Sequence, residues 1–321
     1  MHLSKYEVIT ESMSRFRIRT MTSEDWVEVA EMIHVSLNYW YASKGDGPKL
    51  KCGPEHVLLH CQVNEALDPG CCLVTEMEST GRLAACCFYH PRARHVSLGI
   101  MAAHPNYFGT GAAKAILGEV IAFAEKEEKP LRLVSSAMNL DSFSLYNRAG
   151  FVPYAIFQDM LIDVPPEGLD LPEIEGVEVR TGRIEDAPAM AALEREISGV
   201  ERESDFRHFL QNREGIWHVS VTENDSGELN GFLCSVTHPG CSLIGPGVSR
   251  NERQAAGLLR VVLNHEPGRT RVWLTPCDKT ELVQTCYSWG ARNCEIHVAQ
   301  TLGEKLPISG IIMPTFMPET W

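Results

Sequence analysis

The chain has 321 residues, with a hydrophobic fraction of 44% and a charged fraction of 22%, which is typical of a globular protein and excludes a disordered one. One hydrophobic core rarely organises this length, so we expect two domains. The formal net charge of -13 argues against a nucleic-acid partner, because such proteins need a basic surface to contact phosphates.

No run of 18 apolar residues that could span a bilayer is present, and the first 17 residues lack the apolar stretch of a signal peptide. We therefore expect a cytoplasmic protein without a membrane partner, either a monomer or a homodimer. The eleven cysteines include the pairs Cys71-Cys72 and Cys86-Cys87 inside apolar runs, and they form no CxxC or Cys/His pattern with zinc spacing. The sequence predicts neither disulfides nor a metal site.

The first half of the chain alternates strand and helix patterns up to Asp163. Turn residues separate three consecutive strands that we expect to pair antiparallel. A glycine turn then leads from the third of these strands directly into an amphipathic helix. In chain order, we expect strand 16–20, helix 22–38, strands 71–77, 83–89 and 96–103, helix 112–127, strand 131–135, helix 142–149 and strand 154–162.

Residues 164–176 are rich in proline and acids and read as a linker. Beyond them, residues 177–303 repeat the same outline, so we expect an α/β (α+β) protein of two tandem domains, each with a mixed sheet flanked by helices. The tail, 304–321, is apolar and contains prolines, so we expect it to pack on the body. The elements expected in the repeat are strand 177–180, helix 184–197, strands 217–222, 231–237 and 242–244, helix 255–264, strand 271–275, helix 281–289 and strand 295–300.

The junction between the third strand and its helix carries the segment Phe108-Gly109-Thr110-Gly111-Ala112-Ala113. Two glycines one residue apart at a helix start let the backbone approach an anion, and the free amides with the helix dipole favour phosphate. By itself this pattern is equally compatible with an ordinary tight turn.

A second motif follows at the end of the next strand and across the next helix, with Asn139, Ser142 and Tyr146 followed by Gly150-Phe151. Together the two motifs resemble the GNAT superfamily of N-acetyltransferases. In that family the pyrophosphate loop reads Arg/Gln-x-x-Gly-x-Gly/Ala, and a later helix carries a tyrosine ahead of Gly-Phe. The resemblance covers about Arg15 to Asp163 and implies a tandem two-domain form with splayed central strands in each sheet.

The resemblance implies acetyl-CoA as cosubstrate. Backbone amides of the segment from Gly109 to Lys114 would bind its pyrophosphate, and Met101, Ala102 and Ala103 would lie beside the pantetheine arm. Asn139 would fix that region, with Ser142 beside it. Tyr146 would protonate the departing thiolate, although a tyrosine at this place could also simply pack on its helix.

The general base is not evident, because the strand 96–103 contains no acid where many relatives carry glutamate. His95 stands at the start of this strand and is one candidate for the base. A water molecule that passes the proton to an unidentified carboxylate is the preferred alternative. Phe108 replaces the usual arginine or glutamine of the loop. Lys114 could compensate by its charge, or could be an ordinary solvated lysine.

The second half departs from the family pattern. Aligned on the apolar residues of its helix, its loop reads from Arg250 to Ala255, with Arg253 in place of the glycine. Cys286 takes the place of the tyrosine and Lys279 that of the asparagine, so we expect this domain to be degenerate and non-catalytic. The predicted function is transfer of an acetyl group from acetyl-CoA to the primary amine of a small molecule or peptide by the first domain. The alternative is a non-catalytic sensor or interaction protein that binds CoA or acyl-CoA.

Overall fold

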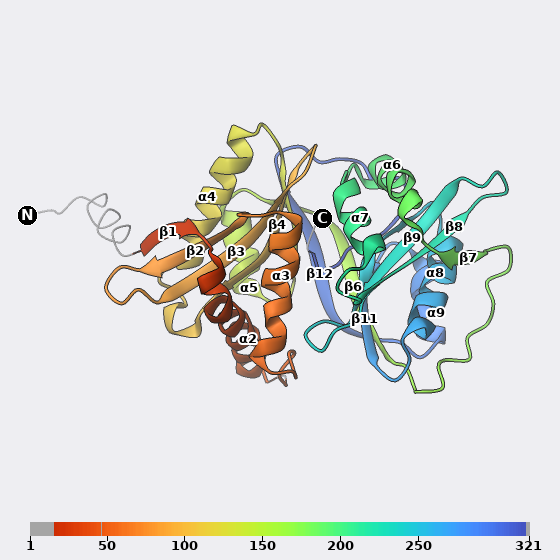
Figure 1. Ribbon diagram of the computed structural model, residues 1–321, viewed down its shortest axis with the longest axis horizontal. Helices are drawn as coiled ribbons and strands as arrows, with labels where there is room; N and C mark the ends of the chain where they lie inside the picture. The colour runs from red at the N-terminus through yellow and green to blue at the C-terminus, as the bar shows by residue number, and fades with distance from the viewer. Residues whose placement is uncertain (1–15, 46, 319–321) are drawn as a thin grey trace, which may run out of the picture. The chain divides into compact units, whose positions relative to one another are not determined.

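The computed structural model describes residues 16–45 and 47–318. The N-terminal segment, in which the sequence shows no signal peptide pattern, lies mostly outside the described residues. Contacts divide the chain into two compact units (Figure 1): Met1–His90 with Leu98–Glu127, and Pro91–Ser97 with Glu128–Trp321. These units do not coincide with the two sequence repeats, whose boundaries at residues 163 and 177 stay a prediction. Among the described residues, every helix is too short or too polar to cross a bilayer.

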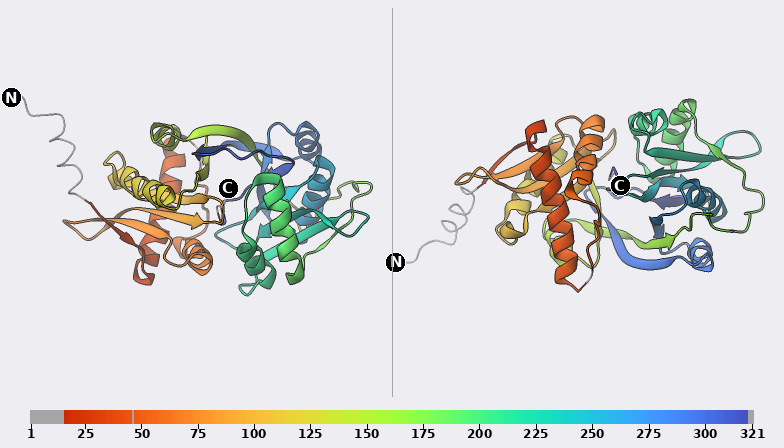
Figure 2. Two further views of the ribbon diagram at one scale, coloured as in Figure 1. Left: turned by 90° about the horizontal axis from the view of Figure 1, so that it is seen from above. Right: turned by 60° about the horizontal axis from the view of Figure 1, so that its bottom comes forward.

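The first unit holds a sheet in the order β1-β2-β3-β4. Strand β1 pairs antiparallel with β2, and β2 pairs antiparallel with β3, the second of these pairings as predicted. Its buried core lies between this sheet and α2, where Val29, Ile33, Val74 and Phe88 are almost fully enclosed. Figure 2 shows α2 alongside α3. The elements are β1 (Phe16–Thr20), η1 (Ser23–Asp25), α2 (Trp26–Ser43), η2 (Pro54–Val57), α3 (Leu58–Leu67), β2 (Cys72–Met77), β3 (Leu83–Pro91), β4 (Val96–Ala103), η3 (Pro105–Tyr107) and α4 (Ala112–Lys126).

The second unit holds a longer mixed sheet in the order β5-β12-β6-β11-β10-β9-β8-β7. The first two residues of β4, which belong to this unit, pair in parallel with the start of β5. The elements are β5 (Leu131–Ser136), α5 (Leu140–Arg148), β6 (Val152–Asp163), β7 (Val179–Thr181), η4 (Ile184–Asp186), α6 (Ala187–Ser198), α7 (Glu203–Gln211), β8 (Trp217–Glu223), β9 (Leu229–Val236), β10 (Leu243–Ser249), α8 (Glu252–His265), β11 (Thr270–Pro276), α9 (Thr280–Ser288), β12 (Arg292–Leu302) and β13 (Ile311–Met313).

The strand order shows that the two repeats exchange their last strands. The last strand of the first repeat, β6, pairs with β11 of the second, and the last strand of the second repeat, β12, pairs with β5 of the first. Helices α5 and α9 correspond residue for residue with a separation of 140, from Leu140 to Thr280. The same separation relates the strand registers, because His297 pairs with Ser136 and Phe157 pairs with Pro276. The exchange therefore has a local twofold pseudosymmetry.

The central strands of the second repeat splay apart, as the fold prediction requires. Only Leu243 and Ile244 of β10 pair with β11, and β10 then diverges after Gly245. Strand β13 of the C-terminal tail pairs antiparallel with the diverging part of β10, at Gly247 to Ser249. The tail packs closely, because a Cβ on Gly310 would lie 2.6 Å from the carbonyl oxygen of Ser249.

Candidate active site

The loop His104–Gly111 connects β4 to α4 and contains the predicted glycine motif. Gly109 and Gly111 have φ values of +73° and +93°, in the left-handed region that a side chain disfavours. An added Cβ at either glycine would meet no atom of the described residues within 4 Å, so both border open space. Gly111 is the N-cap of α4, whose first amides have no intrahelical acceptor. The loop therefore presents backbone donors, at the positive end of a helix dipole, to an anion.

The side chains around the loop have varied environments. The Phe108 ring is 42% exposed and meets the ring of Tyr39 edge-on, at 6.0 Å between centroids. The Thr110 hydroxyl donates to the carbonyl of Tyr107 at 2.6 Å and stabilises the turn. Lys114 is exposed, which is compatible with both of its predicted roles. On β4, Ala102 is buried in the core, whereas Met101 and Ala103 are half-buried on the opposite face.

The second predicted motif is built around α5. The Asn139 side chain caps this helix by accepting a hydrogen bond from the Ser142 amide at 3.1 Å, and the Ser142 hydroxyl donates back to the Asn139 carbonyl at 3.1 Å. Tyr146 lies near the other end of the helix, 6% exposed, with its ring 5.7 Å from that of Phe151. Asn139 and Ser142 thus have a structural role that accounts for their spacing.

His95 is completely buried, and its ring nitrogen lies 3.1 Å from the Ser97 hydroxyl. Burial and the nearby guanidinium groups, Arg132 foremost, hold its pKa well below the usual value. A base for a solvent-borne amine must contact that amine, so the absence of exposed surface argues against His95 in this role.

The surroundings of His95 include a buried ionic cluster, in which arginines that follow β3 and cap α7 meet acids of α6 and α7. Arg92 pairs with Asp205 at 2.9 Å, and Arg202 pairs with Glu194 through a short contact. Because buried charges are tolerated only when they are paired, these groups have a structural explanation.

The second repeat has a much shorter loop at the corresponding place. Only Arg250 and Asn251 separate β10 from α8, whereas eight residues separate β4 from α4. The N-cap of α8 is Asn251, which forms a capping box with Gln254. The sequence alignment that put Arg253 at the glycine position is therefore wrong by two residues. Arg250 is paired with Glu196 through contacts of 2.6 and 2.9 Å.

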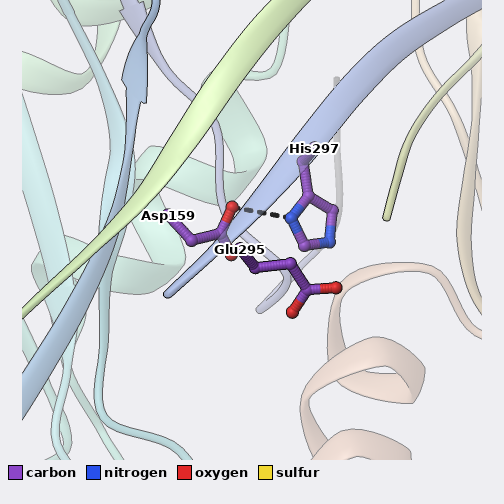
Figure 3. A group of neighbouring side chains, drawn as sticks. All are labelled: Asp159, Glu295 and His297. Atoms are coloured by element: carbon purple, nitrogen blue, oxygen red, sulfur yellow. Dashed lines mark hydrogen bonds and ion pairs between the residues drawn. The ribbon is translucent and has the colours of Figure 1, made fainter. Parts of the chain in front are cut away.

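A group of polar residues that the motifs did not reveal lies on the exchanged strands. Asp159 of β6 and Glu295 and His297 of β12 are buried, and their potential ligand atoms all lie within 4.8 Å of one another. Nδ1 of His297 is 2.7 Å from Oδ1 of Asp159 (Figure 3). The Ser136 hydroxyl donates to Oε1 of Glu295 through a short hydrogen bond. This donor set of one nitrogen and two carboxylates could bind a cation.

The sequence contained one signal for this group, since Glu295 and His297 alternate on a strand and so share a face. Nothing local showed that Asp159 would lie opposite them, because the pairing joins β6 to a strand more than 130 residues away.

Comparison with known proteins gives matches over both repeats. The model of the acetyltransferase (GNAT) family matches residues 31–151, and a second model, of an acetyltransferase (GNAT) domain, matches residues 190–307. The chain belongs to the GNAT family. Among curated proteins, none matches its sequence at a significant level.

Solved structures share the tandem GNAT fold at low sequence identity. A putative acetyltransferase from Pyrococcus horikoshii has 14% identity and a TM-score of 0.71, over 93% of this chain and 92% of that one. A GCN5-related N-acetyltransferase from Sphaerobacter thermophilus has 19% identity and a TM-score of 0.64, over 92% and 98%. A tandem GNAT protein from the clavulanic acid biosynthesis pathway has 16% identity and a TM-score of 0.59, over 91% and 100%. These likenesses support the predicted fold class.

The GNAT assignment gives the two motifs a common context. The loop His104–Gly111 and the segment from Asn139 to Tyr146 both lie within residues 31–151, which the first family model matches. The loop belongs to the first unit, and Asn139 and Tyr146 belong to the second.

Proposed function

We propose that the protein is an N-acetyltransferase that transfers the acetyl group of acetyl-CoA to the primary amine of a small molecule or peptide. The observation that carries this proposal is the loop with Gly109 and Gly111, both left-handed and open, leading into the N-terminus of α4. Backbone amides from Gly109 to Lys114 bind the pyrophosphate of CoA, and the β4 segment from Met101 to Ala103 binds the pantetheine arm.

The chemistry belongs to the first repeat in this proposal. In the second repeat, the loop is shortened to two residues and β13 pairs with the diverging edge of β10. In a GNAT domain the pantetheine arm lies where these two strands diverge. In the second repeat, β13 of the tail takes that place. One CoA molecule per chain is the expected stoichiometry.

Tyr146 is the proposed acid for the departing thiolate. A thiolate leaves more easily when a proton donor lies beside the sulfur, and a tyrosine hydroxyl is a suitable donor. Tyr287 of the second repeat is displaced by one position, is 46% exposed, and donates to Oε1 of Gln158 at 2.7 Å. It offers a matched control.

The test measures acetyl-CoA binding by calorimetry and thiol release across a panel of amines. Wild-type protein and Tyr287→Phe should bind one equivalent and turn over at least one amine, and Tyr146→Phe should bind equally but turn over more slowly. Turnover unchanged in Tyr146→Phe would remove the acid role. One tight CoA site without turnover on any amine would favour the non-catalytic sensor instead.

A further inference from the structure

A cavity of about 330 Å³ lies in the second unit where β11 ends. Three segments line it: residues 154–157 of β6, residues 276–279 between β11 and α9, and part of the C-terminal tail. All of this lining belongs to the second unit. The volume lies at the lower end of the range of about 300–1,000 Å³ that small-molecule sites occupy. We call this space the tail cavity.

The walls of the tail cavity are held by backbone pairing and by close packing. The amide of Cys277 donates to the carbonyl of Ile156 at 2.9 Å, and Pro276 pairs with Phe157. On the tail side, β13 pairs with β10, and Ile312 of β13 is 2% exposed. The walls are therefore ordered by the fold itself, so a ligand does not have to order them.

Most of the side chains around the tail cavity are apolar. Phe157 is fully buried and Ile308 of the tail is half-buried, whereas Ile156 is 53% exposed. Burying hydrocarbon against such a surface is favourable, so a ligand of this cavity should have an apolar body. The apolar members of the lining are Ala155, Ile156, Phe157, Pro276, Ile308 and Ile312.

The charged groups at the tail cavity favour an anion. Lys279 lines the cavity with a side chain that is 27% exposed, and its ammonium lies 3.0 Å from Asp278, whose side chain is 73% exposed. A carboxylate so exposed compensates a lysine only weakly, because water screens the pair. The ammonium of Lys305 lies 5.4 Å from the centroid of the Tyr154 ring, which is part of the lining. The positive charge of Lys279 is thus available to a bound anion.

The pseudosymmetry of the two repeats shows that Lys279 has no capping role. Its counterpart at a separation of 140 is Asn139, which caps α5 with its side chain. A lysine ammonium only donates, so Lys279 cannot cap α9 in the same way. Instead Glu252 of α8 accepts from the amide of Leu282 at 2.7 Å, and Glu252 is not part of the lining. Because this helix amide already has its acceptor, we expect the anion at the Lys279 ammonium.

We propose that the tail cavity is a binding site for a short-chain aliphatic carboxylate, a function beyond the proposed acetyl transfer and independent of it. The carboxylate group pairs with the ammonium of Lys279, and the hydrocarbon chain lies against Phe157 and the isoleucines of the tail. One wall belongs to the tail, so a bound carboxylate also stabilises the packing of the tail. Inorganic phosphate is a poor ligand for this site, because it carries charge but no apolar body.

Alkylation of Cys277 reports occupancy of the tail cavity directly. This half-buried cysteine lines the cavity, and burial followed by the charge of Asp278 raises the pKa of its thiol. Its reaction with iodoacetamide should therefore be slow, and mass spectrometry of the Cys277 peptide can follow it. Butanoate, the probe, should slow this reaction about tenfold at ten times its Kd, since about one site in eleven then stays empty. Cys52, half-buried in the first unit, should react at an unchanged rate.

Three variants separate recognition of the carboxylate group from filling of the cavity. Lys279→Met should raise the Kd of butanoate by about tenfold or more, because a charge-assisted hydrogen bond is lost. Ile308→Trp adds bulk to the tail wall and should abolish the protection of Cys277 by butanoate. The matched control, Lys126→Gln, removes an exposed lysine of α4 in the first unit and should leave the Kd of butanoate unchanged. Urea melts show whether each variant is folded.

The choice of ligands tests the proposed chemical class. Butan-1-ol, butylammonium and inorganic phosphate should each protect Cys277 far less than butanoate does, at equal concentration and constant ionic strength. Equal protection by butan-1-ol would overturn the proposal, because it would show an apolar cavity that does not recognise an anion. An unchanged alkylation rate in about 100 mM butanoate, a hundred times a millimolar Kd, would overturn it as well.

Two further outcomes would contradict the proposal. One is a folded Lys279→Met protein that binds butanoate as tightly as the wild type. The other is protection of Cys277 by acetyl-CoA that requires Lys279, which would assign the cavity to a second cofactor molecule. None of these measurements involves turnover, so a failure of the proposed acetyl transfer would leave their results unaffected.

Discussion

The buried imidazole of His95 should make the free energy of unfolding fall as the pH falls below 6.5. Measuring this fall tests whether His95 has a structural role. In the folded protein the pKa of His95 is held well below 6.5, chiefly by burial and then by Arg132, whereas in the unfolded chain it returns to about 6.5. As the pH falls below 6.5, only the unfolded chain takes up this proton, so the free energy of unfolding falls. Relative to a pH well above 6.5 the loss is at most RT ln(1 + 10^(6.5 − pH)), about 1.4 kcal/mol at pH 5.5.

Urea melts of the wild-type protein and of His95→Gln at pH 7.5 and 5.5 measure this loss. Gln can keep a hydrogen bond to Ser97 but does not titrate, so the pH dependence of the variant should be smaller by about 1.4 kcal/mol. The pKa of His218 is lowered to about 4, first by burial, but this residue titrates alike in both proteins and cancels. Equal pH dependence in the two proteins would refute the reasoning. A folded variant that loses all turnover at pH 8 would return His95 to the list of candidate bases.

Three further predictions concern the loop and the tail. Gly111→Ala should destabilise the protein by about 1–2 kcal/mol in urea melts and weaken CoA binding, because the φ of Gly111 is +93°. The control, Gly118→Ala in the interior of α4, should stabilise the protein by about 0.5–1 kcal/mol. Equal effects of the two substitutions would contradict the left-handed conformation of the loop. Gly310→Ala would bring a Cβ to 2.6 Å from the Ser249 carbonyl oxygen and should weaken the packing of the tail by about 1–3 kcal/mol. The tail should then be cleaved faster by a protease, and an unchanged cleavage rate would contradict its close packing. Phe108→Arg adds a cation beside the proposed pyrophosphate site and should tighten CoA binding by about 1 kcal/mol, or roughly fivefold, as measured by calorimetry. The affinity of the variant should also fall more steeply with salt concentration than that of the wild type. An unchanged affinity would indicate that the phosphates lie elsewhere.

Most regular elements were predictable because their patterns are local. The strand 96–103 and the helix from Ala112 were placed within a residue of their observed ends, since β alternation and the glycine turn before the helix leave clear marks. Helix α7 was missed because its buried face combines Phe206 and Phe209 with the charged Asp205, which hides the apolar period. Helix α3 was missed as well. It follows a 3-10 turn, and its N-cap, Val57, offers no capping side chain.

The site was predictable only where its chemistry lies in one segment. The glycine loop and Asn139 to Tyr146 each form a contiguous motif, and the structure gives Gly109 and Gly111 the conformations that the motif requires. The group Asp159, Glu295 and His297 escaped because its members come from β6 and β12, and a strand pattern does not specify its partner. The shortened second loop escaped because the first turn of α8, Glu252 to Gln254, is polar and does not continue the apolar period, so the alignment slipped by two residues.

The strand exchange shows what the second repeat contributes to the first through backbone pairing. Both neighbours of β6, which are β11 and β12, belong to the second repeat, and β5 pairs with β12 along its whole length. Without that repeat, β6 would lose both ladders and the buried Asp159 would lose His297, so burial of this carboxylate would no longer be compensated. The pairing of β5 and β6 with strands of the second repeat requires only backbone hydrogen bonds. It therefore does not depend on the length of the loop between β10 and α8. The second repeat therefore contributes to the first a paired strand, β12, which completes the ladders of β5 and β6.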